Sequence, residues 1–261
     1  MVLESKVKQE NVVFKKSLKE RKQEICWTDY VHRMKNTAIK GENVAMVKKT
    51  EQMEFWSGNF GKEYTDRNEV LNVKEWDKFY EETWGISRTA MNTEFIGGFS
   101  RDIKVLEVGC NVGHQLLCLQ AMGFKNLYGI ELQPYAVEKA KEHTKNINIF
   151  QGSGFDTPFK DGYFDLVFTS GVLIHISPND LNEILSEIYR CSKQWIWGFE
   201  YFAETHQEIT YRGKSNVLWK GNFAKNYFET FPDLMLIKEK KYPYRTNQNE
   251  DSMFLLQRKD N

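Results

Sequence analysis

The sequence predicts an α/β fold in which a doubly wound, mostly parallel sheet carries helices on both faces. Residues 103–108 form a short apolar, β-branched run that is typical of a strand buried on both faces. From there to residue 201, strand-like and helix-like segments alternate, which favours parallel strands joined by crossover helices. The length of 261 residues is enough for one sizeable core.

The individual elements follow from hydrophobic periodicity and from the residues that interrupt it. After the first strand, the further expected strands are 126–131, 147–151, 163–170 and 194–201. The helices expected between them are 114–122, 134–144 and one that ends at Arg190 and is capped by Ser177 or Asn179. Residues 74–100 are expected to be helical, and residues 235–239 and 253–258 are expected to close the sheet with an antiparallel last strand.

Charge separates the N-terminal part from the rest of the chain. The whole chain has a net charge of zero, but residues 1–50 hold twelve Lys and Arg against six Asp and Glu. A thin apolar stripe formed by Val7, Phe14, Leu18 and Ile25 predicts an N-terminal helical extension there, and a basic arm for RNA or another polyanion is the alternative. Residues 51–261 are predicted to form the main domain.

No apolar run in the sequence is long enough to span a bilayer, and the first residues lack the uninterrupted apolar core of a secretory signal. We therefore expect a cytoplasmic protein without a membrane partner. The four cysteines, Cys26, Cys110, Cys118 and Cys191, show no metal-ligand spacing with the five histidines. They are expected to be reduced thiols, and no metal site is predicted.

The first strand leads into a glycine turn, Gly109-Cys-Asn-Val-Gly113, and then into a helix. Glycine permits a sharp turn and a close approach of the ligand to the backbone, and Asn111 is one of the few other residue types that tolerate positive φ. Dinucleotides and S-adenosylmethionine (SAM) are the two ligand classes that such a turn serves. A dinucleotide fingerprint requires a third glycine, which is absent here.

Two acidic residues favour SAM over a dinucleotide. Glu107, near the end of the first strand, would repel a pyrophosphate but would favour the ammonium group of an amino-acid ligand. Glu131 ends the second strand, where an acid can hydrogen-bond both ribose hydroxyls. An NAD-dependent oxidoreductase is therefore disfavoured.

An aromatic segment at residues 51–70 precedes the first strand, and it is predicted to be a lid that excludes water from a bound ligand. Trp56, Phe60, Tyr64 and Arg67 carry this prediction, and an ordinary hydrophobic anchor for the N-terminal helices is the alternative. The nearby Gly61-Lys62 pair does not form a phosphate-binding loop, because the glycine spacing is short and Glu63 follows the lysine.

Taken together, these motifs resemble class I SAM-dependent methyltransferases over residues 52–258. The narrower resemblance is to the pseudaminic acid biosynthesis-associated methylases, and it rests on FWSGNFGKEYTDRN, on VLEVGCNVGHQL and on EYF followed by TYRGKSNVLWKGNFA. The resemblance implies a Rossmann-like, seven-stranded sheet, SAM as cofactor and proximity to sugar-acid pathways. Ser153 replaces the aspartate that many relatives carry after the third strand, so the adenine contact is expected from a backbone amide and Phe155.

The candidate site residues form three groups. The expected cofactor contacts are Tyr64, Arg67, Glu107, Gly109, Cys110, Asn111, Gly113, Glu131, Leu132, Ser153, Gly154, Phe155 and Ser170. The candidate catalytic residues are His175, which is either a base or a packed, hydrogen-bonded histidine, together with Glu200 and Tyr201. The substrate candidates on the variable loop are Tyr211, Arg212, Lys214 and Trp219, and a solvated loop is the alternative there.

The expected reaction is transfer of the SAM methyl group to an oxygen or nitrogen of a small molecule by a monomer or homodimer. An RNA or protein methyltransferase that uses the basic N-terminal arm, and a non-catalytic SAM-binding protein, are the alternatives. Nucleic acid is not the expected partner, because no aromatic-rich RNA-binding motif accompanies the basic residues.

Overall fold

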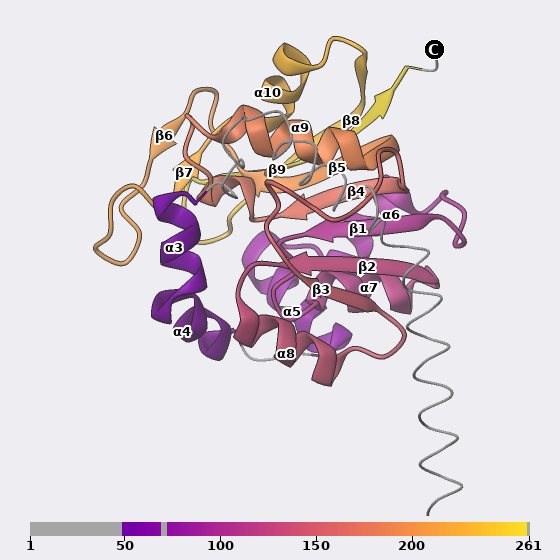
Figure 1. Ribbon diagram of the computed structural model, residues 1–261, viewed down its shortest axis with the longest axis horizontal. Coiled ribbons are helices and arrows are strands. Elements are labelled where there is room, and N and C mark those ends of the chain that lie inside the picture. Colours follow the sequence, from indigo (N-terminus) through magenta and orange to yellow (C-terminus); the bar gives the residue numbers. More distant parts are fainter. Residues whose placement is uncertain (1–48, 69–71, 260–261) are drawn as a thin grey trace, which may run out of the picture. The chain divides into compact units, whose positions relative to one another are not determined.

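The computed structural model of the protein describes residues 49–68 and 72–259 (Figure 1). The expected N-terminal extension falls on residues 1–48 and so lies outside the described residues. Residues 49–157 and 162–259 belong to one unit, and all elements named below are part of it. Within the described ranges, no helix has the length and apolar character needed to cross a bilayer.

A seven-stranded sheet in the order β3-β2-β1-β4-β5-β9-β8 forms the centre of this unit (Figure 1). The strands are β1 (Lys104–Val108), β2 (Asn126–Glu131), β3 (Asn148–Gln151), β4 (Phe164–Ser170), β5 (Ser192–Tyr201), β8 (Leu234–Pro243) and β9 (Glu250–Arg258). The first five pair in parallel, whereas β9 is antiparallel to both β5 and β8. The predicted mostly parallel sheet with an antiparallel last strand is confirmed.

Helices surround the sheet and precede it. The four that follow β1 are α7 (His114–Ala121), α8 (Pro134–His143), α9 (Leu181–Cys191) and α10 (Phe223–Thr230). The four that come before β1 are α3 (Glu51–Ser57), α4 (Asn59–Arg67), α5 (Val73–Trp84) and α6 (Arg88–Ile96). A short 3₁₀ helix, η1 (Leu173–His175), follows β4, and a separate hairpin pairs β6 (Gln207–Glu208) with β7 (Trp219–Lys220).

Local signals at helix ends correct two of the expected elements. The continuous helix expected over residues 74–100 is wrong, because Gly85 takes φ +77° and ends α5, and Ser87 then caps α6. The cap expected from Ser177 or Asn179 is also wrong, because α9 begins after Asp180, whose side chain makes no capping hydrogen bond.

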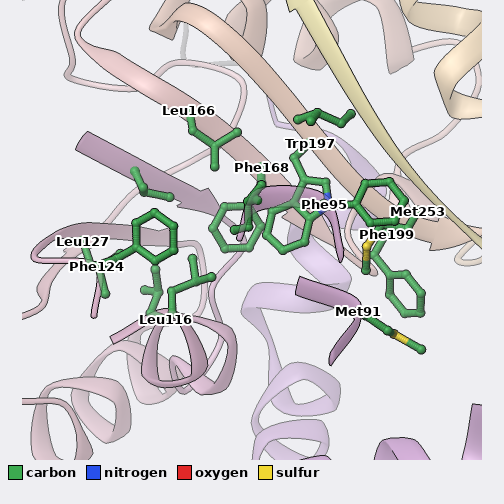
Figure 2. Packing of buried hydrophobic residues seen from close by; sticks show 14 of the residues in the cluster. Met91, Phe95, Leu116, Phe124, Leu127, Leu166, Phe168, Trp197, Phe199 and Met253 are labelled. Atoms are coloured by element: carbon green, nitrogen blue, oxygen red, sulfur yellow. The ribbon is translucent and has the colours of Figure 1, made fainter. Parts of the chain in front are cut away.

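The core on one face of the sheet joins helices α5, α6 and α7 to alternate residues of the strands. Figure 2 shows Leu166, Phe168, Trp197 and Phe199 of β4 and β5 facing helix residues such as Leu116. All of these side chains are 5% exposed or less. Helix α8 lies on the same side of the sheet as α5 and α7, whereas α9 and α10 lie on the other face (Figure 1). Burial on both faces explains why the strands read as nearly continuous apolar runs.

Candidate functional site

A cavity lies over the carboxyl ends of β1 to β4, where the sheet places the ends of four neighbouring parallel strands. Its sheet-side lining comes from the last residues of these strands and from the residues that follow them: Val108, Gly109, Asn111, Ile130, Glu131, Leu132, Gln133, Gly152, Ser153, Gly154, Phe155, Ser170, Gly171 and Val172. Helices α3 and α4 supply the opposite wall: Gln52, Met53, Trp56, Gly61 and Tyr64. His175, Ile176 and Ile184 complete it.

The glycine turn forms the floor of the cavity, and its backbone takes the conformation that the sequence predicts. Gly109 has φ +73° and Asn111 has φ +46°, both in the left-handed region. A Cβ atom at Gly109 would lie 2.6 Å from Cγ2 of Val172, so no larger residue fits there. The amides of Gly109 and Cys110 donate to the carbonyl of Ile130, which holds the turn against β2.

Glu131 is held rigidly at the end of β2. Its Oε2 accepts the Asn111 amide at 2.9 Å, and its Oε1 accepts the Gln133 amide at 2.7 Å. Burial raises the pKa of the Glu131 carboxyl, and these amide donors partly oppose that increase. The side chain is therefore fixed in one orientation at the cavity wall before any ligand arrives.

Glu107 lies beneath the turn and does not line the cavity. Its side chain is only 2% exposed, and Oε2 has no hydrogen-bond partner among the described residues. Burial raises the pKa of Glu107 well above its ordinary value, and the nearby Arg88 opposes this only in part. The structure places Glu107 outside the cavity lining, because β1 turns this side chain into the protein.

His175 is the last residue of η1 and lines the cavity as a neutral imidazole. Its Nδ1 lies 3.0 Å from the carbonyl oxygen of Val217, so Nδ1 carries the proton and donates it, which leaves Nε2 as an acceptor. Burial lowers the pKa of His175 to about 4. The ring packs against Trp56 at a centroid distance of 4.3 Å. His175 is thus both packed and able to accept one hydrogen bond.

Glu200 contacts the backbone of the turn that leads to His175, and it does not line the cavity. It is 1% exposed, it is absent from the cavity lining, and its Oε2 accepts the amides of Val172 and Ile174 at 3.0 and 3.4 Å. Burial raises the pKa of Glu200 to about 7. The expectation that it faces the crevice is corrected, because the backbone of residues 172–174 turns back over the end of β5 and covers this carboxyl group.

Tyr201, the other acid–base candidate on β5, also lies outside the cavity lining. The Nζ atom of Lys220 is 4.3 Å from the centre of its ring, and the Tyr244 ring is 5.8 Å away. These contacts turn Tyr201 toward β7 and the segment that follows β8. The structure therefore does not bring Tyr201 and His175 together at one wall.

Of the loop residues predicted to bind substrate, only Tyr211 approaches the cavity. Its ring centroid is 6.4 Å from that of His175 and 6.0 Å from that of Phe60. Arg212 and Lys214 are exposed near the tip of the hairpin, whereas Trp219 is 5% exposed within β7. The hairpin thus contributes one aromatic ring near the cavity, and its two cations point to solvent.

Some of the remaining cofactor candidates line the cavity, and others lie outside it. Tyr64, Leu132, Ser153, Gly154, Phe155 and Ser170 line the cavity together with the turn residues. Arg67 does not line it, because Arg67 is exposed, pairs with Glu63 at 3.6 Å and lies over the Phe60 ring. Cys110 and Gly113 also lie outside the lining; Cys110 is buried, and Gly113 precedes α7 with φ +87°.

The sequence interpretation missed Gln133 and two residues of α3, Gln52 and Met53. Gln133 is 6% exposed, and its Nε2 donates to carbonyls at the end of α3. The acceptors are remote in sequence, so no local pattern could reveal the contact. Gln52 and Met53 belong to the segment expected to be a lid, but only the aromatic residues there gave a signal.

Comparison with known proteins matches part of this chain to methyltransferases. Residues 106–194 match the family model of a methyltransferase domain. An uncharacterized methyltransferase of Synechocystis sp. is 34% identical over 90 residues, which cover 34% of this chain and 42% of that protein. A 24-methylenesterol C-methyltransferase of Arabidopsis thaliana is 28% identical over 120 residues, 41% of this chain and 33% of that protein. The matches therefore span less than half the length of these curated relatives.

Solved structures share the fold at low sequence identity. The Synechocystis magnesium protoporphyrin IX methyltransferase, solved with bound SAM, superposes with a TM-score of 0.57 at 12% identity, covering 82% of this chain and 100% of that one. A 1,6-didemethyltoxoflavin-N1-methyltransferase of Burkholderia thailandensis gives 0.57 at 10% identity, covering 83% and 94%. These likenesses establish the fold, and the geometry of the cavity has to support any function.

Proposed function

We propose that the protein is a class I, SAM-dependent methyltransferase that transfers the SAM methyl group to an oxygen or nitrogen of a small molecule. The observation that carries this proposal is the fixed Glu131 carboxylate beside the Gly109–Asn111 turn. Both border one cavity, and a Cβ atom at Gly109 would collide with Val172. These features fit a ligand that combines a ribose with an amino-acid group.

Individual residues have distinct roles in this proposal. Glu131 would accept hydrogen bonds from the ribose hydroxyls, each worth about 1.5 to 3 kcal/mol because the acceptor is charged. Ser153, Gly154 and Phe155 would border the adenine, while Asn111 and Ser170 would border the methionine portion. Glu107 would act beneath the turn, without direct contact. The aromatic side chains Trp56 and Tyr64 support the proposed lid role of residues 51–70, since both line the cavity.

When bound, SAM supplies a methyl group on a sulfonium, which is already a good leaving group. The residues of the protein then have mainly to align the two reactants, a contribution that can reach about 7 to 11 kcal/mol. His175 would orient the acceptor by accepting a hydrogen bond at Nε2. Because burial lowers its pKa to about 4, the imidazole is a poor base, and the favoured acceptor is a nucleophile that attacks without losing its proton beforehand.

The proposed acceptor class is a small metabolite, such as a sugar acid or a related compound. The wall beside His175 consists of Trp56, Tyr64 and, farther out, Tyr211, which suits a compact molecule better than a polymer. The resemblance to pseudaminic acid biosynthesis-associated methylases supports sugar acids as the first compounds to test. Arg212, which is exposed at the hairpin tip, could bind an acceptor carboxylate as the acceptor enters.

The test is an assay of S-adenosylhomocysteine (SAH) formation from SAM with a panel of sugar acids, amines and short RNA oligonucleotides. We expect turnover with a small acceptor and little effect of salt on its rate. Turnover only with RNA, with a steep loss as salt increases, would contradict the small-molecule proposal. Tight SAM binding without turnover on any member of the panel would favour a non-catalytic protein.

A further inference from the structure

Gln133 connects the sheet side of the cavity to helices α3 and α4, which form the opposite wall. We propose that it is a positioning residue that holds these two helices closed over the bound cofactor. The inference rests on the proposed function, because it assigns a role to a residue of the same cavity. Gln133 itself would act through Trp56 and the backbone around it.

The side-chain amide of Gln133 reaches the end of α3. Its Nε2 donates toward the carbonyl oxygens of Trp56, Ser57 and Gly58, at 3.3, 2.9 and 3.0 Å. The last carbonyls of a helix have no partner within the helix, and burying them without one is costly. Gln133 therefore satisfies the carbonyls with which α3 ends, and it does so from the opposite wall of the cavity.

The rest of Gln133 is tied to the cofactor side. Its main-chain amide donates to Oε1 of Glu131 at 2.7 Å, and its Oε1 accepts the Tyr135 amide at the start of α8 at 3.1 Å. Only 6% of the residue is exposed. Gln133 alone thus links the Glu131 carboxylate, which is proposed to bind the ribose, to the end of α3, by hydrogen bonds on both sides.

The position of α3 determines where Trp56 lies. The Trp56 ring lines the cavity and packs against His175, while its carbonyl is one of the three that Gln133 contacts. Helix α4 follows closely, because a Cβ atom on Gly61 would lie 1.7 Å from the Trp56 carbonyl oxygen. Fixing the end of α3 therefore fixes the start of α4 and, with it, the Tyr64 wall.

The opposite end of α3 is held at the hairpin. Gln52 donates to the carbonyl of Asn216 at 3.0 Å, and the Asn216 side chain donates to Glu51 at 3.0 Å, next to the hairpin where Figure 1 shows α3 and β6 side by side. Glu51 and Asn216 are exposed, so water competes for their hydrogen bond. Gln52 itself is 5% exposed, so its contact holds the start of α3, while the Gln133 contacts hold the end of the helix that carries Trp56.

The experiment measures amide hydrogen exchange in wild type and in Gln133→Glu, which keeps the size of the side chain but cannot donate to the three carbonyls. Gln133→Met is the second variant, in case the glutamate prevents folding. The matched control is Gln120→Glu, which removes one amide-to-carbonyl bond, to Lys145 at 2.7 Å, away from the cavity. The peptides compared cover 51–67 and 104–121, and each protein is measured with and without SAH.

We expect exchange over residues 51–67 to accelerate about tenfold in the Gln133 variants without ligand, with no change over 104–121. SAH dissociation should accelerate by a similar factor, and Gln120→Glu should behave as wild type. Unchanged exchange over 51–67, or acceleration throughout the domain in both Gln133 variants, would overturn the proposal. If wild type binds no SAH, the proposed function fails, while the ligand-free exchange still decides the role of Gln133.

Discussion

Replacement of Glu200 by Gln should change how the stability of the protein depends on pH. Burial raises the pKa of the folded protein's Glu200 to about 7, against an ordinary value of 4.5. A raised pKa means that the folded state binds the proton more tightly than the unfolded state. The stabilisation is therefore fully present below pH 4.5 and is lost as the pH rises through about 7. The difference corresponds to about 3 kcal/mol, at 1.36 kcal/mol per pKa unit.

The assay is reversible urea unfolding of wild type and Glu200→Gln at intervals between pH 4.5 and pH 8. Other buried groups also titrate in this range, notably Asp251, whose pKa burial raises to about 7, and His175, whose lowered pKa acts with the opposite sign. The difference between the two proteins isolates Glu200. Wild type should gain about 3 kcal/mol relative to the variant at the acidic end. Parallel stability curves would refute the reasoning.

Three further predictions concern local geometry. Gly109→Ala should destabilise the protein by about 2 to 5 kcal/mol, because alanine is strained at a left-handed φ and its Cβ atom would collide with Val172. Gly98→Ala should not destabilise it, because the space around Gly98 is open. Equal melting temperatures of the two variants would contradict this prediction. The His175 ring protons, assigned in NMR spectra with His175→Gln, should not titrate between pH 8 and 5.5, and a midpoint near 6.5 would be incompatible with burial. Asn72→Ala should cost about 1 kcal/mol by removing the capping box of α5, and an unchanged unfolding midpoint would argue against that role.

Much of the fold could be predicted because it depends on local patterns. The alternating strands and helices, the glycine turn with positive φ at Asn111 and the second strand ending at Glu131 all follow from neighbouring residues. The break at Gly85 was missed although glycine often ends a helix, since the aromatic residues on either side suggested one continuous helix. Here a local signal existed and the apolar pattern outweighed it.

The parts of the site that the sequence did not reveal depend on contacts between distant segments. Glu200 lies near the end of β5 and His175 follows β4 at the same edge of the sheet, but backbone amides of the turn after β4 bind the Glu200 carboxylate. Gln133 acts on carbonyls more than seventy residues away. Tertiary packing decides such orientations, and neither residue type nor spacing encodes them locally.

The central claim is that the cavity binds SAM through the fixed carboxylate of Glu131. The most direct measurement is calorimetric titration of wild type and Glu131→Ala with SAM and SAH. Loss of one or two charge-assisted hydrogen bonds should weaken binding by about tenfold or more. Micromolar binding by wild type with that loss in the variant would support the account. Equal affinity in the two proteins would contradict the role of Glu131, and absence of binding by wild type would contradict the account as a whole.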